Sequence, residues 1–242
     1  MDSLTSFDRF AEEYDNEMGD SGDYSHKNTI DGCLLDLVGD VNGLVIYDLA
    51  CGNGYMARRF VKEGAKEVWA SDISERLIDF AKNKYNASGI KYFVRSADDF
   101  TDIPENHFDL ITMHMALFYI EDLGKLFQNI HTSLKTDGRF VFTYDHPLRL
   151  LAYKVMGIDV DLETEYEEYL NEGLKKNFNN WTKKQDDLWI YRRPLGSIIN
   201  ALGRNKLLVK AMTEPKTKTM YMDKQFESAI PFKMGFEAVK VT

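Results

Sequence analysis

Cysteine is scarce in this 242-residue chain, and long apolar runs are absent. Cys33 and Cys51 are the two cysteines, which excludes a disulfide framework and a four-cysteine zinc site. Apolar runs such as 44–47 and 115–120 fall far short of the roughly 20 residues that a membrane-spanning helix needs. The acidic first fifteen residues lack the pattern of a secretory signal. We therefore expect a cytoplasmic protein with no membrane partner and no bound metal.

Positive charge is also in short supply. Lys and Arg number 30 against 39 Asp and Glu, which gives a formal net charge of −9. A protein that grips nucleic-acid phosphates over a broad face needs a surplus of basic residues, so we expect no nucleic-acid partner. Hydrophobic residues make up 44% and aromatic residues 13% of the chain. That content is sufficient for one sizeable core and argues against disorder.

Short apolar strands alternate with amphipathic helices in the first half of the chain. Apolar spacing predicts helices between the strands, and Ser74 and Asp122 are suitable N-caps. The predicted strands lie at residues 44–47, 67–71, 90–95, 108–114 and 139–144. This alternation predicts an α/β fold with a doubly wound, mostly parallel sheet.

The rest of the chain frames this sheet. Residues 1–40 carry two helical patterns, which we expect to pack over the ligand site. Residues 147–192 break the βα rhythm with aromatic and acidic residues, so we predict a helical and aromatic cap insertion that faces the substrate. Residues 41–146 and 193–242 then form one ligand-binding domain. The polar link 214–235 is too short for a crossover helix, which favours an antiparallel ending of the sheet.

The most informative motif follows the first predicted strand and opens a helix. It reads Asp48-Leu49-Ala50-Cys51-Gly52-Asn53-Gly54. Small residues at alternating positions let the backbone approach a ligand closely. Free N–H groups at the next helix start can receive a carboxylate or a phosphate. Residues 52–57 also fit the dinucleotide fingerprint G-x-G-x-x-G/A, and a glycine-rich turn without function is a further alternative.

Two carboxylates favour a cationic nucleoside over a dinucleotide. Asp48 ends the first strand, where it is badly placed for a pyrophosphate but suits an ammonium or sulfonium group. Asp72 ends the second strand, where a carboxylate can accept hydrogen bonds from both ribose hydroxyls. Together they predict a nucleoside with a positively charged, amino-acid-like tail. S-adenosylmethionine fits that description.

With these motifs, residues 44–145 resemble the catalytic domain of class I S-adenosylmethionine-dependent methyltransferases. The loop at 48–54 resembles the first motif of that family, and residues 71–74 resemble its second. Residues 96–99 resemble the adenine-edge motif, and 108–111 with His114 resemble the fourth-strand motif. Ala50 stands where many members have glycine, and alanine is an ordinary variant there.

The resemblance implies a Rossmann-like methyltransferase fold with a seventh, antiparallel strand. It also implies S-adenosyl-L-methionine as cofactor, S-adenosyl-L-homocysteine as product, and in-line methyl transfer to an O, N or C nucleophile of a small molecule. We expect Tyr14 either to act as a lid over the cofactor or to pack in the core. The cofactor contacts that we expect are Tyr14, Asp48, Ala50, Cys51, Gly52, Asn53, Gly54, Asp72, Ile73, Ser74, Ala97, Asp98 and His114.

The acceptor side is less defined by the sequence. His146 follows the fifth strand and is held extended by Pro147, which makes it the candidate general base; a capping role is the alternative. A base is needed only if the acceptor carries a proton. The acidic residues in 163–168 form a solvated helix face or attract a cationic acceptor. Four aromatic residues either wall an acceptor pocket or form the core of a small cap: Tyr166, Tyr169, Trp181 and Trp189.

Three rival functions stay in view. A nucleic-acid methyltransferase is opposed by the charge balance and by residues 114–117, which lack the Asn/Asp-Pro-Pro-aromatic signature. A nicotinamide oxidoreductase needs a further catalytic domain, for which the chain has little room. A non-catalytic S-adenosylmethionine-binding protein stays open. Either a monomer or a homodimer is compatible with the sequence.

Overall fold

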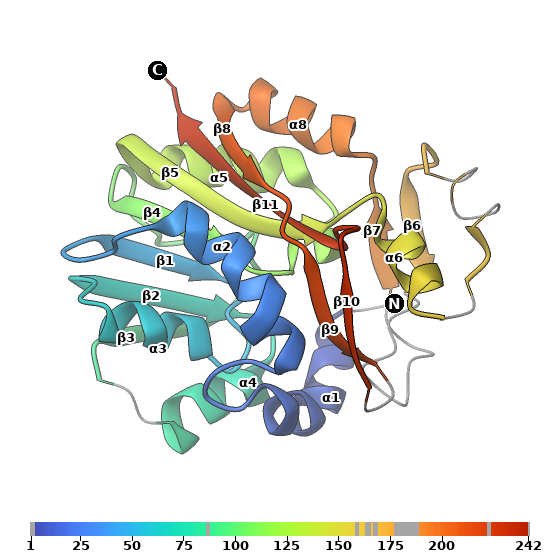
Figure 1. The fold of residues 1–242 in the computed structure, drawn as a ribbon. Helices are drawn as coiled ribbons and strands as arrows, with labels where there is room; N and C mark the ends of the chain where they lie inside the picture. The colour runs from blue at the N-terminus through green and yellow to red at the C-terminus, as the bar shows by residue number, and fades with distance from the viewer. Residues whose placement is uncertain are drawn as a thin grey trace.

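A seven-stranded sheet forms the centre of the molecule, in the order β3-β2-β1-β4-β5-β11-β8 (Figure 1). The computed structural model describes residues 3–85, 88–157, 160–162, 166, 169–176, 189–221 and 224–241. The strands of the sheet are β1 (Val45–Leu49), β2 (Glu67–Asp72), β3 (Ile90–Val94), β4 (Phe108–Met113), β5 (Leu134–Asp145), β8 (Leu207–Thr213) and β11 (Lys233–Lys240). Strands β1 to β5 pair in parallel, whereas β11 is antiparallel to both of its neighbours. The predicted mostly parallel sheet with an antiparallel last strand is confirmed.

Helices cover both faces of this sheet because its strands are apolar on both faces. Ile46 packs with Leu34 and Phe60 on one face, whereas its neighbour Tyr47 packs with Phe127 on the other. The helices are α1 (Ser3–Met18), η1 (His26–Ile30), α2 (Asp31–Val38), α3 (Tyr55–Lys62), α4 (Glu75–Asp79), η2 (Phe80–Lys84), η3 (Leu117–Tyr119), α5 (Leu123–Ser133), α6 (Arg149–Val155) and α8 (Leu195–Arg204). Both predicted N-caps are confirmed: Ser74 accepts the Leu77 N–H, and Asp122 accepts the Lys125 N–H.

The strand order reverses between β1 and β4, which places a ligand-binding crevice at the carboxyl ends of these strands. The parallel register sets Asp48 of β1 opposite Ala70 of β2 and Thr112 of β4. The loops that leave β1, β2, β4 and β5 therefore meet along one edge of the sheet. In Figure 1 the helices α1 and α6 and the short strands β6 (Gly173–Lys176) and β7 (Trp189–Arg192) lie beyond this edge.

The link between β8 and β11 contains a hairpin that the sequence analysis did not foresee. Its strands are β9 (Thr217–Tyr221) and β10 (Lys224–Ser228). The hairpin reaches η1, where the Thr29 hydroxyl donates to the Lys218 carbonyl at 2.8 Å and accepts from its N–H at 2.7 Å. The antiparallel ending predicted for the sheet is present, with this hairpin inserted into it.

The predicted cap at 147–192 begins with α6 and includes the short strands β6 (Gly173–Lys176) and β7 (Trp189–Arg192). It is thus only partly helical. Trp181 and most of the acidic run at 163–168 lie outside the described residues. Within the described part of the chain, no helix combines the length and apolar character needed to cross a membrane.

Helix α2 approaches the antiparallel strand β11 closely because Gly235 has no side chain. A Cβ built on Gly235 would clash with the carbonyl oxygen of Cys33. We expect Gly235→Ala to lower the free energy of unfolding by about 1–3 kcal/mol, since the helix must shift away from the strand. Urea denaturation measures the change. Gly203→Ala in α8 is the matched control, because an added Cβ there meets open space and should be neutral or stabilising.

Candidate functional site

The loop after β1 turns through three left-handed residues. The φ angles are +53° at Ala50, +57° at Gly52 and +78° at Gly54. A Cβ added to Gly52 would lie 2.8 Å from the hydroxyl of Tyr14, and one added to Gly54 would lie 2.7 Å from that of Tyr92. Glycine is therefore required at both positions by backbone conformation and by space. Ala50 adopts its left-handed conformation at a cost of about 1–2 kcal/mol.

Asp72 ties this loop to the start of the next helix. Its Oδ2 accepts the Gly52 N–H at 2.8 Å, and its Oδ1 accepts the Ser74 N–H at 2.9 Å. Burial raises the pKa of the carboxyl, and these backbone bonds work against that shift. The sequence therefore places a carboxylate directly beside the glycine loop, where the ribose of a nucleoside is expected. Ile73, the next residue, is half-buried.

Asp48 presents a carboxylate oxygen that the described residues leave unsatisfied. Its Oδ1 accepts the Thr112 hydroxyl at 2.7 Å, whereas its buried Oδ2 has no hydrogen-bond partner among them. Burial, with a smaller contribution from Asp72, raises the pKa of Asp48 to about 7. A buried carboxylate without a partner is costly unless a cation completes it. The ammonium of an amino-acid tail fits this site, and an anionic pyrophosphate does not.

Helix α1 is held over this site by a cluster around a buried carboxylate. Asp15 accepts from the Asn53 amide at 2.7 Å and from the Tyr85 hydroxyl at 2.9 Å, and it pairs with Lys84. At the other end of α1, Asp8 accepts the Ser74 hydroxyl at 2.5 Å. The side chains of Asn53 and Ser74 thus hold α1, and their contact with the cofactor stays a prediction.

The sequence analysis missed Asp15, although a signal was present. Asp15 lies four residues after Ala11, on the apolar face of the helix, next to Tyr14. A carboxylate on that face needs a buried partner. Through this anchoring, the half-buried Tyr14 lies against Gly52 and also packs against the core cluster that contains Phe60, so the lid role stays a prediction beside the core role.

Three other predicted cofactor residues are placed as follows. Ala97 is buried after β3. Asp98 accepts the Ser96 hydroxyl at 2.5 Å and pairs with Lys125 of α5 at 3.2 Å. Burial raises the pKa of Cys51 well above its usual value, so the thiol stays neutral inside the loop. Their roles at the cofactor stay predictions, and a passive role for Cys51 agrees with its protonation.

Both ring nitrogens of His114, at the end of β4, have hydrogen-bond partners within the protein. Its Nε2 lies 3.0 Å from Asp31 Oδ1, and its Nδ1 lies 2.9 Å from the hydroxyl of Thr143. The same Asp31 oxygen accepts the Tyr55 hydroxyl at 2.9 Å. Burial lowers the pKa of His114 and outweighs the opposing effect of Asp31, so the ring is neutral at pH 7. The Nε2–H donates to Asp31 and the Nδ1 accepts from Thr143.

His146, the predicted general base, is likewise held at both ring nitrogens. Its Nε2 lies 2.6 Å from Glu214 Oε1, and its Nδ1 accepts the Leu148 N–H at 3.0 Å. An imidazole that accepts a backbone N–H has no open lone pair for a substrate proton. This geometry favours a role in holding the turn after β5, and the role as a base stays a prediction.

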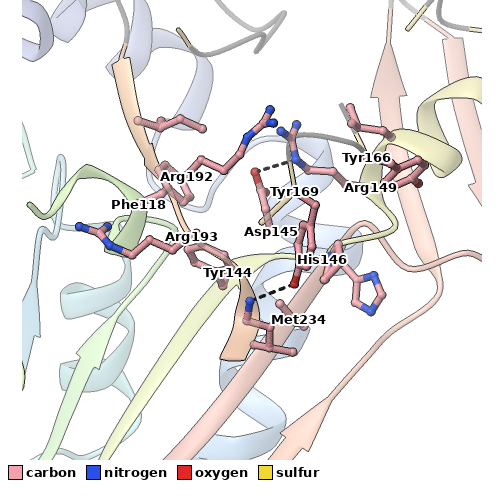
Figure 2. A pocket seen from close by; sticks show the side chains of 14 residues that line it. Phe118, Tyr144, Asp145, His146, Arg149, Tyr166, Tyr169, Arg192, Arg193 and Met234 are labelled. Carbon is pink, nitrogen blue, oxygen red and sulfur yellow. Dashed lines mark hydrogen bonds and ion pairs between the residues drawn. The ribbon is translucent and has the colours of Figure 1, made fainter. Parts of the chain in front are cut away.

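A partly open cavity lies at the carboxyl end of β5 (Figure 2). Tyr166 and Tyr169 line it and Trp189 does not, and contact of these residues with an acceptor stays a prediction. The dashed lines in Figure 2 mark Arg149 beside Asp145 at 3.4 Å and the Tyr169 hydroxyl accepting the Leu195 N–H at 2.9 Å. The lining residues are Phe118, Tyr144, Asp145, His146, Pro147, Arg149, Leu150, Tyr166, Tyr169, Ile190, Arg192, Arg193, Leu195 and Met234.

Comparison with known proteins shows which family the residues of this site resemble. The family model described as a methyltransferase domain matches residues 47–142, which carry the glycine loop, Asp72 and His114. The crystal structure of an S-adenosylmethionine-dependent methyltransferase from Mesorhizobium loti is 27% identical, with a TM-score of 0.65 over 84% of this chain and 93% of that one. Residues 47–142 are a methyltransferase domain of the S-adenosylmethionine-dependent kind. Its cofactor is S-adenosyl-L-methionine.

Two relatives show how far this methyltransferase domain is shared. An uncharacterized protein of Haemophilus influenzae is 28% identical over 75% of this chain and 74% of its own length. The human mitochondrial arginine-hydroxylase NDUFAF5 is 31% identical over 117 residues, which are 48% of this chain and 33% of that protein. The chain thus spans only about a third of the hydroxylase it matches. Within the described residues, no three His, Cys, Asp or Glu side chains converge to hold a metal.

Asp72 gives the most direct test of the cofactor site. We expect Asp72→Ala to weaken S-adenosylhomocysteine binding by roughly 1.5–3 kcal/mol, because it removes charge-assisted bonds to the ribose. Asp72→Ala also removes the hydrogen bond that the Gly52 N–H donates to the Asp72 carboxylate. Calorimetry measures the affinity, with Asp109→Ala at the amino end of β4 as a distant control. An affinity equal to that of the wild type removes Asp72 from the site.

We expect Asp48→Asn to have opposite effects on the stability of the fold and on the binding of the cofactor. The pKa of Asp48 is about 7 in the folded protein and near 4 when unfolded, so its ionisation destabilises the fold increasingly as pH rises from 4 to 7. The amide removes this cost while its oxygen still accepts from Thr112. We expect a gain of at most about 4 kcal/mol at pH 8 and none near pH 4, with weaker binding of S-adenosylmethionine.

Thermal unfolding across pH and calorimetry at pH 8 measure the two effects of Asp48→Asn. A variant that is no more stable at pH 8 than at pH 4, relative to the wild type, contradicts a buried ionised Asp48. Undiminished cofactor affinity contradicts its role as the partner of the ammonium.

Proposed function

We propose that this methyltransferase acts on a small molecule bound in the cavity at the carboxyl end of β5. The observation that carries this proposal is the position of the cavity at the carboxyl end of β5, together with its lining of aromatic, apolar and arginine side chains. Strand β5 is adjacent to β4, which is adjacent to the Asp48 strand. An acceptor in the cavity therefore lies along the same sheet edge as the cofactor loop.

The protein's contribution to methyl transfer is chiefly positioning. When bound, S-adenosylmethionine supplies a methyl group that is already activated by the positive sulfur. Asp48 would hold its ammonium, Asp72 its ribose, and the 50–54 loop its amino-acid tail through backbone contacts. Such positioning of two reactants can contribute on the order of 7–11 kcal/mol to lowering the barrier. Tyr14 and α1 shield the site from water on the side of the glycine loop.

The chemistry of the cavity wall supports an acceptor with a flat or apolar part and a polar group. Phe118, Tyr144 and Tyr169 provide ring surfaces. The side chains of Arg192 and Arg193 also line the cavity, and Arg193 donates to the Glu121 carbonyl at 2.5 Å. Apolar walls with a few placed polar groups are typical of small-molecule sites.

Transfer of labelled methyl groups is the test of this function. The protein is incubated with methyl-labelled S-adenosylmethionine and a panel of hydroxylated, amino and carbon-nucleophile metabolites. We expect label in the small-molecule fraction and one S-adenosylhomocysteine per methyl group transferred. Tight cofactor binding without label transfer supports a non-catalytic binding protein instead. A product that has gained oxygen and no methyl group supports a hydroxylase, the activity named for NDUFAF5.

Leu195→Trp tests whether the acceptor occupies the cavity. Leu195 lines the cavity at the start of α8, so an indole there fills acceptor space. We expect KM for the acceptor to rise at least tenfold, while the affinity for S-adenosylhomocysteine stays within twofold of the wild type. Leu170→Trp is the matched control, because Leu170 is 75% exposed and is not among the lining residues. Equal KM values for both variants would place the acceptor elsewhere.

A further inference from the structure

A histidine outside the family motifs forms an aspartate–histidine pair above the cofactor loop. His26, in η1, places its Nδ1 2.8 Å from Asp23 Oδ1, and its backbone N–H donates to the same oxygen at 2.7 Å. A carboxylate oxygen can only accept here, so the Nδ1 carries the proton and the Nε2 carries the lone pair. Burial raises the pKa of Asp23, but the bonds from His26 outweigh it and the net shift is downward, so Asp23 is ionised.

The His26 ring lies where the loop after β1 meets the end of β4. Its centroid is 5.6 Å from that of His114, which ends β4, and 6.2 Å from that of Tyr55, which follows Gly54. Asp23 is also close enough to Tyr14 to raise the pKa of that phenol, although burial is the larger cause. The pair therefore lies beside the end of β4, the strand between β1, which carries the cofactor loop, and β5. His26 is not among the residues that line the β5 cavity, so the acceptor atom would have to extend from that cavity toward the end of β4.

His26 differs from the other histidines of this edge in having an open ring nitrogen. His114 and His146 are held at both nitrogens, as described above. Within the described part of the chain, the Nε2 of His26 makes no hydrogen bond, and 16% of the side chain is exposed, against 7% for His114. An oriented imidazole with an open lone pair is the arrangement that general-base catalysis requires.

We propose that His26, oriented by Asp23, is the general base of this methyltransferase and that the acceptor atom is a protonated oxygen or nitrogen. This assignment rests on the proposed function. In the step, the acceptor X–H bond breaks and its proton goes to the Nε2 of His26. The X–methyl bond forms as the methyl–sulfur bond breaks, and its electron pair stays on sulfur, which leaves as a neutral thioether. The products are X–CH₃, S-adenosylhomocysteine and an imidazolium.

Carboxylates from neighbouring elements surround His26, where the imidazolium of this step would form. Asp23 bonds its Nδ1–H, Asp31 of α2 lies across the ring of His114, and Glu17 of α1 is near enough for His26 to lower its pKa against the larger effect of burial. His114 is neutral and Tyr55 is protonated, so neither offsets these carboxylates. A carbon nucleophile without an acidic proton would not need this aspartate–histidine pair as a general base.

The test compares His26→Gln with His131→Gln, the same change on α5, where the ring bonds the Val241 carbonyl far from the site. Label transfer from S-adenosylmethionine to a panel of phenols and primary amines is measured from pH 6 to 9. For His26→Gln we expect kcat to fall by about 10²–10⁴-fold and the acid limb of the pH profile to disappear. Asp23→Asn should lose less, and the control should match the wild type.

Two further measurements separate a proton-transfer role from a structural one. Calorimetry with S-adenosylhomocysteine should give wild-type affinity for His26→Gln, which shows that the site is folded. Added imidazole should restore part of the activity of His26→Ala. In the free wild-type protein, ¹⁵N spectra of the imidazole should show the Nδ1–H tautomer for His26 and the Nε2–H tautomer for His114.

The possible results lead to different conclusions. A wild-type protein that labels no member of the panel, and instead labels a carbon acceptor, overturns the assignment of His26 but leaves the proposed function intact. A protein that transfers to no acceptor overturns the proposed function, and the assignment falls with it. An unchanged kcat in His26→Gln, or an Nε2–H tautomer for His26, also overturns the assignment.

Discussion

The unpaired oxygen of Asp48 is the constraint on which the rest of the site depends. The strand that carries it lies in the middle of the sheet, and the carboxylate is buried there. One oxygen is satisfied by Thr112 from the adjacent strand, and the other has no hydrogen-bond partner among the residues that the structure describes. The buried carboxylate is thus an energetic cost at the centre of the fold, and we predict that a cationic ligand removes it. This requirement separates the chain from dinucleotide-binding proteins that share the glycine spacing.

The N-terminal helix α1 packs against the cofactor loop at the edge of the sheet. Asp15 links α1 to Asn53 in the glycine loop and to Lys84 and Tyr85 beyond α4. This docking sets Tyr14 against Gly52 and leads the chain into the 19–25 turn that ends at the Asp23–His26 pair. Asp15 therefore connects the helix that carries Tyr14 to Asn53 in the cofactor loop. The acceptor cavity is built separately, from β5, α6 and the start of α8.

The sequence predicts best those features that recur along the chain or are imposed by backbone geometry. The βα alternation, the glycines of the 48–54 loop and the N-cap at Ser74 are all visible without coordinates, because each follows from local spacing. The β9–β10 hairpin escaped notice since its lysines and threonines lack apolar alternation. The hydrogen bonding of His146 could not be predicted from the sequence either, because Glu214 is distant in sequence and contacts the ring only in the folded protein. His26 lies in a polar stretch whose meaning depends on Asp23 and on His114 of another strand.

The protonation of Asp48, followed by ¹³C spectra of its carboxyl group, tests the central claim most directly. In the free protein we predict a titration near pH 7, where burial places the pKa. In the presence of saturating S-adenosylhomocysteine, whose amino-acid tail carries the same ammonium, the carboxyl should stay ionised at least one pH unit lower. A titration that does not move when the ligand binds would contradict the account, because the buried carboxylate would then have no cation as its partner.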